Sequence, residues 1–203
     1  MTNPREHSPA VFLDKDGTLI NDVPYNVDPS LIELAPRAAE GAALLSAAGF
    51  ALVVVSNQSG VARGLFPEAA IAAVDARIRE LLTEREVPLA GFYYCPHHPQ
   101  GKIAGYATDC ECRKPAPGML TRAAEEMGLD LARSWMIGDI LDDVEAGHRA
   151  GCRSILIDNG HETLWQWNPR RQPDFIAPDL AAAARTILAA DARAIQRALE
   201  TVP

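Results

Sequence analysis

The chain has 203 residues, 48% of them hydrophobic and 23% charged, with a formal net charge of −8, so we expect a single α/β domain over residues 1–203. The acidic balance argues against a nucleic-acid partner, because a phosphate backbone binds basic surfaces. No apolar run is long enough to span a bilayer, and residues 1–10 lack the apolar core of a signal peptide, which favours a cytoplasmic protein without a membrane partner.

Short apolar runs alternate with segments of helical periodicity along the chain. In chain order they predict a strand at Val11–Leu13, a helix at Pro36–Ala48, a strand at Phe50–Val55, a helix at Pro67–Arg85, a strand at Gly91–Tyr94, a helix at Pro117–Met127, a strand at Trp135–Gly138, a helix at Leu141–Ala150, a strand at Arg153–Asp158, an edge strand at Asp174–Ile176 and a closing helix at Asp179–Leu199. This alternation predicts an α/β fold with a doubly wound, mostly parallel sheet covered by helices. The sequence assigns no role to the loop His161–Pro173.

Polar side chains follow three of the predicted strands. They are Asp14 and Asp16, then Ser56 and Asn57, then Asp139. Ligands of such sheets bind beyond the carboxyl ends of the strands, so we expect these groups to meet at one edge. Asp14 and Asp16 are expected to point into one cleft while Lys15 points away. The alternative is an Asx-rich turn in which Gly17 supplies a permissive backbone.

The ordered motifs of this chain resemble those of the haloacid dehalogenase (HAD) superfamily of phosphatases. The motifs are Asp14-Lys15-Asp16-Gly17-Thr18, Ser56, Lys114, and Gly138-Asp139 with Asp143. The resemblance covers roughly residues 11–158. It implies a Rossmann-like HAD fold and a phosphoric monoester hydrolase.

The chemistry of a phosphatase explains these residue types. A phosphate monoester is anionic, so its charge must be neutralised before a nucleophile can approach. Asp14 and Asp139 are hard oxygen ligands suited to Mg²⁺, joined in this prediction by the backbone carbonyl of Asp16. Asp14 is the expected nucleophile, and Asp16 the expected general acid and then base. The Lys114 ammonium and the Ser56 hydroxyl are expected to donate to the phosphoryl group.

Two further acids follow Asp139 in the sequence. Asp143 is expected to orient the metal shell or Lys114, the alternative being a helix-start carboxylate favoured by the helix dipole. Asp142 is expected to face solvent.

Four soft or borderline metal ligands lie at the two ends of a loop over residues 95–112, which we call the zinc loop. Cys95, His97, Cys110 and Cys112 would make a closed tetrahedral zinc shell of three thiolates and one imidazole. His98 is an alternative to His97, and free thiols in a mobile loop are the alternative to a zinc site. The expected zinc is structural and fixes the residues that follow Cys112. Cys152 is expected to be a small buried residue.

Three longer motifs narrow the resemblance. Residues 56–64, 95–101 and 110–115 look like those of the D-glycero-D-manno-heptose 1,7-bisphosphate 7-phosphatases, relatives of the histidinol-phosphate phosphatases. The resemblance implies Mg²⁺-dependent hydrolysis of the C7 phosphate through an aspartyl-phosphate, on the pathway to nucleotide-activated heptose for lipopolysaccharide or other surface glycans. It also implies a capless protein, because the roughly 40 residues between Asp16 and Ser56 hold one predicted helix.

The same resemblance implies a set of substrate contacts. They are Asp22, Tyr25, Ser56, Asn57, Gln58, Ser59, Arg113 and Lys114. Arg63 is a further candidate for the second phosphate, with a solvent-exposed arginine as the alternative. Ile140 departs from the family pattern, because relatives often carry a basic residue there. The alternatives to the heptose substrate are histidinol phosphate or another small sugar phosphate. The non-enzyme alternative is a zinc-stabilised binding module. A monomer is expected.

Overall fold

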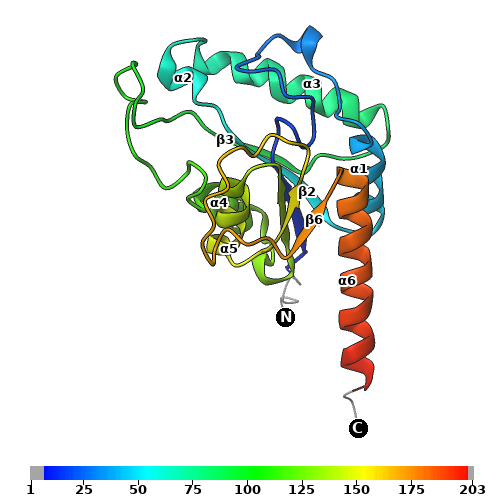
Figure 1. Cartoon of the computed structure of the whole chain (residues 1–203). Helices are drawn as coiled ribbons and strands as arrows, with labels where there is room; N and C mark the ends of the chain where they lie inside the picture. Colours follow the sequence, from blue (N-terminus) through cyan, green and yellow to red (C-terminus); the bar gives the residue numbers. More distant parts are fainter. Residues whose placement is uncertain (1–6, 201–203) are drawn as a thin grey trace, which may run out of the picture.

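Six strands form one sheet with helices on both faces in the computed structural model, which describes residues 7–200 (Figure 1). The strands are β1 (Ala10–Leu13), β2 (Ala51–Asn57), β3 (Gly91–Cys95), β4 (Trp135–Gly138), β5 (Arg153–Ile157) and β6 (Phe175–Ala177). Their order is β3-β2-β1-β4-β5-β6, and all neighbours run parallel. The predicted doubly wound parallel sheet is confirmed, and β6 is an edge strand as expected.

The helices cover both faces because successive side chains of β1 point to opposite sides of the sheet. The α-helices are α1 (Ala38–Ala47), α2 (Gly60–Arg63), α3 (Ile71–Thr83), α4 (Gly118–Met127), α5 (Leu141–Ala150) and α6 (Leu180–Glu200). Val11 and Leu13 share a buried core with α1, α3 and α6, whereas Ala10 and Phe12 face α4 and α5. Figure 1 shows α1 beside α6 and, on the other side of the sheet, α4 beside α5.

The observed boundaries differ from the predicted ones mainly at β2. This strand continues through Ser56 and Asn57, which pair in register with Tyr94 and Cys95 of β3. Both polar residues therefore lie within the strand, whereas the sequence placed them after it. The short helix α2 was not predicted; it ends at Gly64, which adopts a left-handed conformation with φ 73°.

The segment between β1 and β2 carries no additional domain. It forms a 3₁₀ helix, Pro29–Leu31, the helix α1 and two isolated β-bridges at Ile20. The predicted capless architecture is confirmed. None of the helices in residues 7–200 is long and apolar enough to cross a membrane.

Candidate active site

Three carboxylates meet at the carboxyl end of the central strands. Asp14 follows β1, Asp139 follows β4, and Asp143 lies in the first turn of α5. One oxygen of each lies within 4.8 Å of the others, and we call this group the carboxylate site. The strand ends stay together because β1 and β4 pair, and the Asp14 amide donates to the carbonyl of Ile137 at 2.9 Å. The two acids predicted from different strands are therefore neighbours.

Lys114 supplies a positive charge to the carboxylate site. Its side chain is buried and forms ion pairs with Asp14 and with Oδ1 of Asp143, the latter at 2.6 Å. Its Nζ also donates to the backbone carbonyl of Val55 at 2.9 Å. Asp143 therefore contacts Lys114 as predicted, and its Oδ2 also accepts from the Ile140 amide at 3.3 Å, so the alternative of a helix-start carboxylate is observed as well.

Asn57 holds the backbone of Lys114 in place. Its Oδ1 accepts from the Lys114 amide at 3.0 Å, and its Nδ2 donates to the Lys114 carbonyl at 3.0 Å. This two-bond clamp joins the end of β2 to the segment after the zinc loop. The sequence predicted a substrate contact for Asn57, and its amide is here engaged with the protein backbone.

Burial governs the protonation of the acids in this site. It raises the pKa of Asp139 to about 6, with the neighbouring Asp14 charge adding to the effect. Burial likewise raises the pKa of Asp143 to about 8, opposed by Lys114. Burial also disfavours the charged form of Lys114, but Asp14 and Asp143 outweigh it and raise the lysine pKa. The site thus holds more carboxylates than one lysine neutralises, which favours a further cation.

Asp16 lies beside the carboxylate site with its side chain turned to another partner. Its Oδ1 is 2.6 Å from Nζ of Lys15, and its side chain is 32% exposed. Burial raises the pKa of Asp16 to about 6, while Lys15 acts in the opposite direction. The expectation that Lys15 points away was wrong. β1 ends at Leu13 and the chain then turns, so the alternation of a strand no longer applies.

Asp142 was expected to face solvent, and this expectation was wrong as well. Its Oδ1 pairs with Nη2 of Arg171 at 2.6 Å, and the side chain is only 32% exposed. The partner comes from the loop between β5 and β6, a segment without a periodic pattern. Asp143, next in the chain, is fully buried.

A cavity of about 260 Å³ opens beside Asp16. It is lined by Lys15, Asp16, Asp22, Pro24, Tyr25, Asn26, Asn57, Gln58, Ser59 and Gly60. Five of these were predicted as substrate contacts: Asp22, Tyr25, Asn57, Gln58 and Ser59. Gln58 also donates to Oγ of Ser56 at 2.8 Å, so the serine hydroxyl is oriented from within the cavity wall.

The two candidate arginines lie on the zinc loop side and do not line this cavity. Nη2 of Arg63 contacts Nε2 of His98 at 3.1 Å, and Nη1 of Arg113 reaches the carbonyl of His97 at 3.5 Å. In this conformation both guanidinium groups support the loop.

Three residues at the site were not predicted from the sequence. His161 contacts Asp139, Asn159 donates to the carbonyl of Gly17, and Glu162 accepts from the amide of Leu141. All three come from the loop after β5, which lacks periodicity. One signal for them was available in the sequence. Gly160 and His161 come just after a buried strand of a parallel sheet, where ligand-binding residues are expected.

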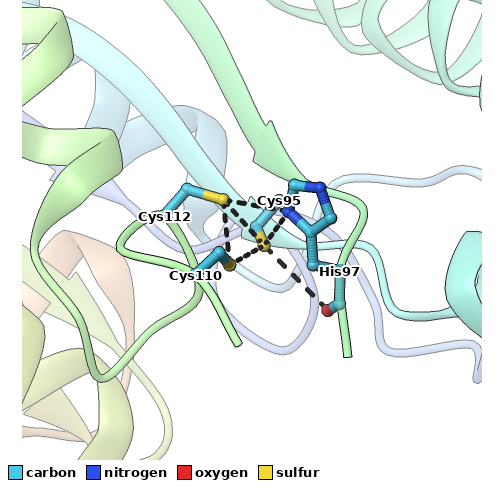
Figure 2. A group of neighbouring side chains, drawn as sticks. All are labelled: Cys95, His97, Cys110 and Cys112. Atoms are coloured by element: carbon cyan, nitrogen blue, oxygen red, sulfur yellow. Dashed lines mark hydrogen bonds between the residues drawn. The ribbon is translucent and has the colours of Figure 1, made fainter. Parts of the chain in front are cut away.

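Figure 2 shows Cys95, His97, Cys110 and Cys112 converging on one point. The three sulfur atoms lie 3.1, 3.2 and 3.5 Å apart, and Nδ1 of His97 lies 3.3 Å from the Cys112 sulfur. Ligands of a tetrahedral zinc ion with Zn–S bonds of about 2.3 Å would lie about 3.8 Å apart, close to these separations. His97, rather than the alternative His98, faces the sulfurs. The hydrogen bond between Cys112 and Cys95 lowers the pKa of Cys112 to about 5, which favours a thiolate.

Each cluster fits one kind of metal ion. The carboxylate site offers hard oxygen donors, and Oδ1 of Asp143 is buried without a well-aligned hydrogen bond. These properties suit Mg²⁺. Three sulfurs and one imidazole nitrogen suit Zn²⁺ in a closed, structural site. Cys152 stands apart from the cluster as a buried thiol, as the sequence predicted.

Comparisons with known proteins identify the family of this chain. A family model described as HAD-hydrolase-like matches residues 111–183. The chain is 43% identical over 153 residues to the D-glycero-β-D-manno-heptose-1,7-bisphosphate 7-phosphatase of Yersinia pestis, covering 75% of this chain and 81% of the relative. For the protein of the same name from Escherichia coli K12, identity is 45% over 153 residues, with 75% and 80% covered.

A solved structure shares the fold over most of its length. It is D,D-heptose 1,7-bisphosphate phosphatase from B. bronchiseptica, complexed with magnesium and phosphate, at 34% identity and a TM-score of 0.76. The match covers 89% of this chain and 98% of that one. The chain therefore belongs to the D-glycero-β-D-manno-heptose-1,7-bisphosphate 7-phosphatase family of HAD-like hydrolases.

Proposed function

We propose that this chain hydrolyses the C7 phosphate of D-glycero-β-D-manno-heptose 1,7-bisphosphate, releasing inorganic phosphate and the heptose 1-phosphate. Relatives at 43–45% identity carry this activity in their names. The single observation that carries the proposal is the buried Lys114 bridging Asp14 and Asp143, with Asp139 within 4.8 Å. Such preorganised charge is what phosphoryl transfer requires of a protein.

The first step transfers the phosphoryl group to the protein. A carboxylate oxygen of Asp14 attacks phosphorus, and the bond from phosphorus to the C7 oxygen breaks. Asp16 gives its proton to the departing oxygen, so the sugar leaves as an alcohol. Because burial raises the pKa of Asp16 to about 6, a fraction of this group is protonated near neutral pH.

The second step frees the enzyme. Water attacks the phosphorus of the aspartyl-phosphate, Asp16 accepts one proton of that water, and the bond from Asp14 to phosphorus breaks. Lys114 stays charged throughout and offsets negative charge at Asp14 and at the transferring group. Oγ of Ser56, oriented by Gln58, is placed to donate to a phosphoryl oxygen.

Two metal ions complete the proposal. Asp14 and Asp139, with the backbone carbonyl of Asp16, would hold Mg²⁺, with Asp143 alongside; when bound, this ion supplies electrostatic shielding of the phosphoryl oxygens. The B. bronchiseptica relative complexed with magnesium and phosphate supports this assignment. Cys95, His97, Cys110 and Cys112 would hold a structural Zn²⁺, supported by their mutual distances.

The sugar would occupy the cavity beside Asp16. Its predicted contacts are Asp22, Tyr25, Gln58 and Ser59, which line that cavity. Tyr25 is half exposed at its rim, in a left-handed conformation with φ 56°. Such a backbone in a non-glycine residue is uncommon and is found where surrounding contacts require it.

Histidinol phosphate and other small sugar phosphates are the rival substrates. A panel with Mg²⁺ present, comparing kcat/KM for the β-anomer, the α-anomer and histidinol phosphate, tests the proposal. We expect the β-anomer to be preferred at least about 10-fold, equivalent to about 1.4 kcal/mol. Preference for histidinol phosphate would favour the rival, and absence of phosphate release from all of them would favour a binding module.

The nucleophile is tested separately. Asp14→Asn should abolish phosphate release and leave the thermal transition cooperative. Turnover at the rate of the unmodified protein would refute the covalent mechanism.

We further propose that the protein acts in the cytoplasm as a monomer, without a nucleic-acid partner. Four free cysteines and a thiolate cluster fit a reducing compartment. The net charge of −8 disfavours binding to polyanions.

A further inference from the structure

The loop that follows β5 is fastened to the segments around the carboxylate site by two hydrogen bonds and is held internally by a third. Nδ2 of Asn159 donates to the carbonyl of Gly17 at 2.7 Å, and Oδ1 of the same residue accepts from the His161 amide at 3.2 Å. One residue further on, Oε2 of Glu162 accepts from the amide of Leu141 at 2.8 Å. Gly17 belongs to the turn after β1, and Leu141 begins α5. The loop therefore spans both segments that carry the predicted magnesium ligands.

These anchors direct the imidazole of His161 at Asp139. Nδ1 of His161 lies 2.6 Å from Oδ2 of Asp139, whose side chain is 7% exposed. This contact requires a glycine at position 17. A Cβ built on Gly17 would lie well inside 3.0 Å of both Oδ2 of Asp139 and Nδ1 of His161. Ile140, next to Asp139, has an apolar side chain and offers no donor. The position of His161 is thus set by its backbone contact with Asn159 and its side-chain contact with Asp139, although its side chain is 40% exposed.

A carboxylate can rotate about its Cβ–Cγ bond, and a metal ligand that rotates freely loses entropy when the ion binds. A hydrogen bond to one oxygen fixes the group and leaves the other oxygen to the cation, and removing such outer partners typically weakens metal binding 10–100-fold. We propose that His161 is a positioning residue, which holds Asp139 by Oδ2 so that its other oxygen is presented to Mg²⁺. This role of His161 rests on the magnesium site of the proposed function.

The test measures metal binding without substrate. Mn²⁺ serves as the probe, titrated into the zinc-loaded, magnesium-free protein and followed by electron paramagnetic resonance of the free ion. In His161→Asn, Nδ2 is separated from Cβ by the same two bonds as the imidazole Nδ1, whereas the amide nitrogen of His161→Gln lies one bond further out. We expect His161→Ala and His161→Gln to weaken Mn²⁺ binding about 10-fold and His161→Asn to remain within about threefold.

Two comparisons make the result decisive. Leu164→Ala changes a strongly exposed residue of the same loop and should bind Mn²⁺ like the unmodified protein. Thermal unfolding of every variant checks that the loop change leaves the fold intact. If His161→Ala binds Mn²⁺ equally or more tightly, the imidazole competes with the ion and the proposal is overturned.

The substrate assignment is tested by other data. A protein that binds Mn²⁺ as expected but does not hydrolyse the heptose bisphosphate leaves the role of His161 standing and refutes only the substrate. A protein that binds no Mn²⁺ refutes the metal site and the role of His161 together.

Discussion

Replacing Lys114 with methionine tests whether the carboxylate site is as highly charged as its geometry indicates. Methionine keeps the length and burial of the side chain but removes the ammonium group that Asp14 and Asp143 share. Two carboxylates whose oxygens lie within 4.8 Å of each other repel by at least about 3.5 kcal/mol at an effective dielectric constant of 20. Proton uptake limits this cost, and loss of one partner from a buried ion pair typically costs about 3–5 kcal/mol.

The expected effect is large enough to measure by thermal unfolding. For a chain of this size each kcal/mol lowers Tm by about 2–4 °C, so Lys114→Met should melt about 10 °C below the unmodified protein at pH 7.5. The measurement uses magnesium-free buffer without chelator, so that zinc is retained. Lys102→Met, which changes an exposed lysine, is the control and should alter stability by less than about 0.5 kcal/mol.

The deficit of Lys114→Met should also depend on pH. Asp139 and Asp143 already have pKa values raised to about 6 and about 8, above that of an unfolded aspartate. Lys114 lowers the pKa of Asp143, so loss of the lysine raises that pKa further. The folded state then binds more protons than the unfolded state, so stability falls as the pH rises from about 5 to 8. A Tm within about 2 °C of the unmodified protein, without this pH trend, would refute the charge assignment.

Three further predictions concern the supports of the site. Asn57→Ala should lower kcat about 100-fold with little change in KM, because it releases the Lys114 backbone; a change in KM alone would favour the predicted substrate contact. Gly17→Ala should abolish phosphate release, whereas Gly49→Ala, with a similar positive φ but open space, should cost only about 1–2 kcal/mol of stability; equal activity losses would contradict this. Cys110→Ser should lose zinc and most activity, and Cys152→Ser should retain one zinc per chain by metal analysis; zinc retained in the first variant would contradict the ligand assignment.

The sheet was predictable because each buried strand is a continuous apolar run. β4 and α5 match their predicted boundaries, and α5 ends where Gly151 adopts a left-handed conformation with φ 90°. The acids at the ends of β1 and β4 follow from the same rule, since parallel strands deliver their carboxyl ends to one edge. The Cys/His cluster was predictable because closely spaced Cys and His residues at both ends of one loop are typical of a structural zinc site.

The remaining contacts depend on tertiary packing between distant segments. Asn57 reaches Lys114 across 57 positions, and His161 reaches Asp139 from a loop without periodicity. Neither contact leaves a local pattern, because one amide or imidazole looks the same whether it faces solvent or a partner. Lys15 was misassigned for a related reason: strand alternation was extended past the residue where pairing ends.

The zinc loop and the carboxylate site are connected through backbone contacts at both ends of the loop. Cys95 is the register partner of Asn57, and its carbonyl accepts from the amide of Gln58 at 2.8 Å. Cys112, at the other end of the loop, lies two residues before Lys114, whose backbone Asn57 clamps. Zinc would thus tie together the two segments that the clamp also joins.

Because zinc and the Asn57 clamp would hold the same two segments, their effects on catalysis should be coupled. If zinc acts on catalysis only by holding Lys114, then loss of zinc and loss of the clamp both displace the same residue, Lys114. Their effects on kcat in the double variant Cys110→Ser/Asn57→Ala should then be clearly less than additive, as expected for residues in one connected network. Full additivity would mean that zinc reaches the active site by another route, through Arg113 or the cavity wall.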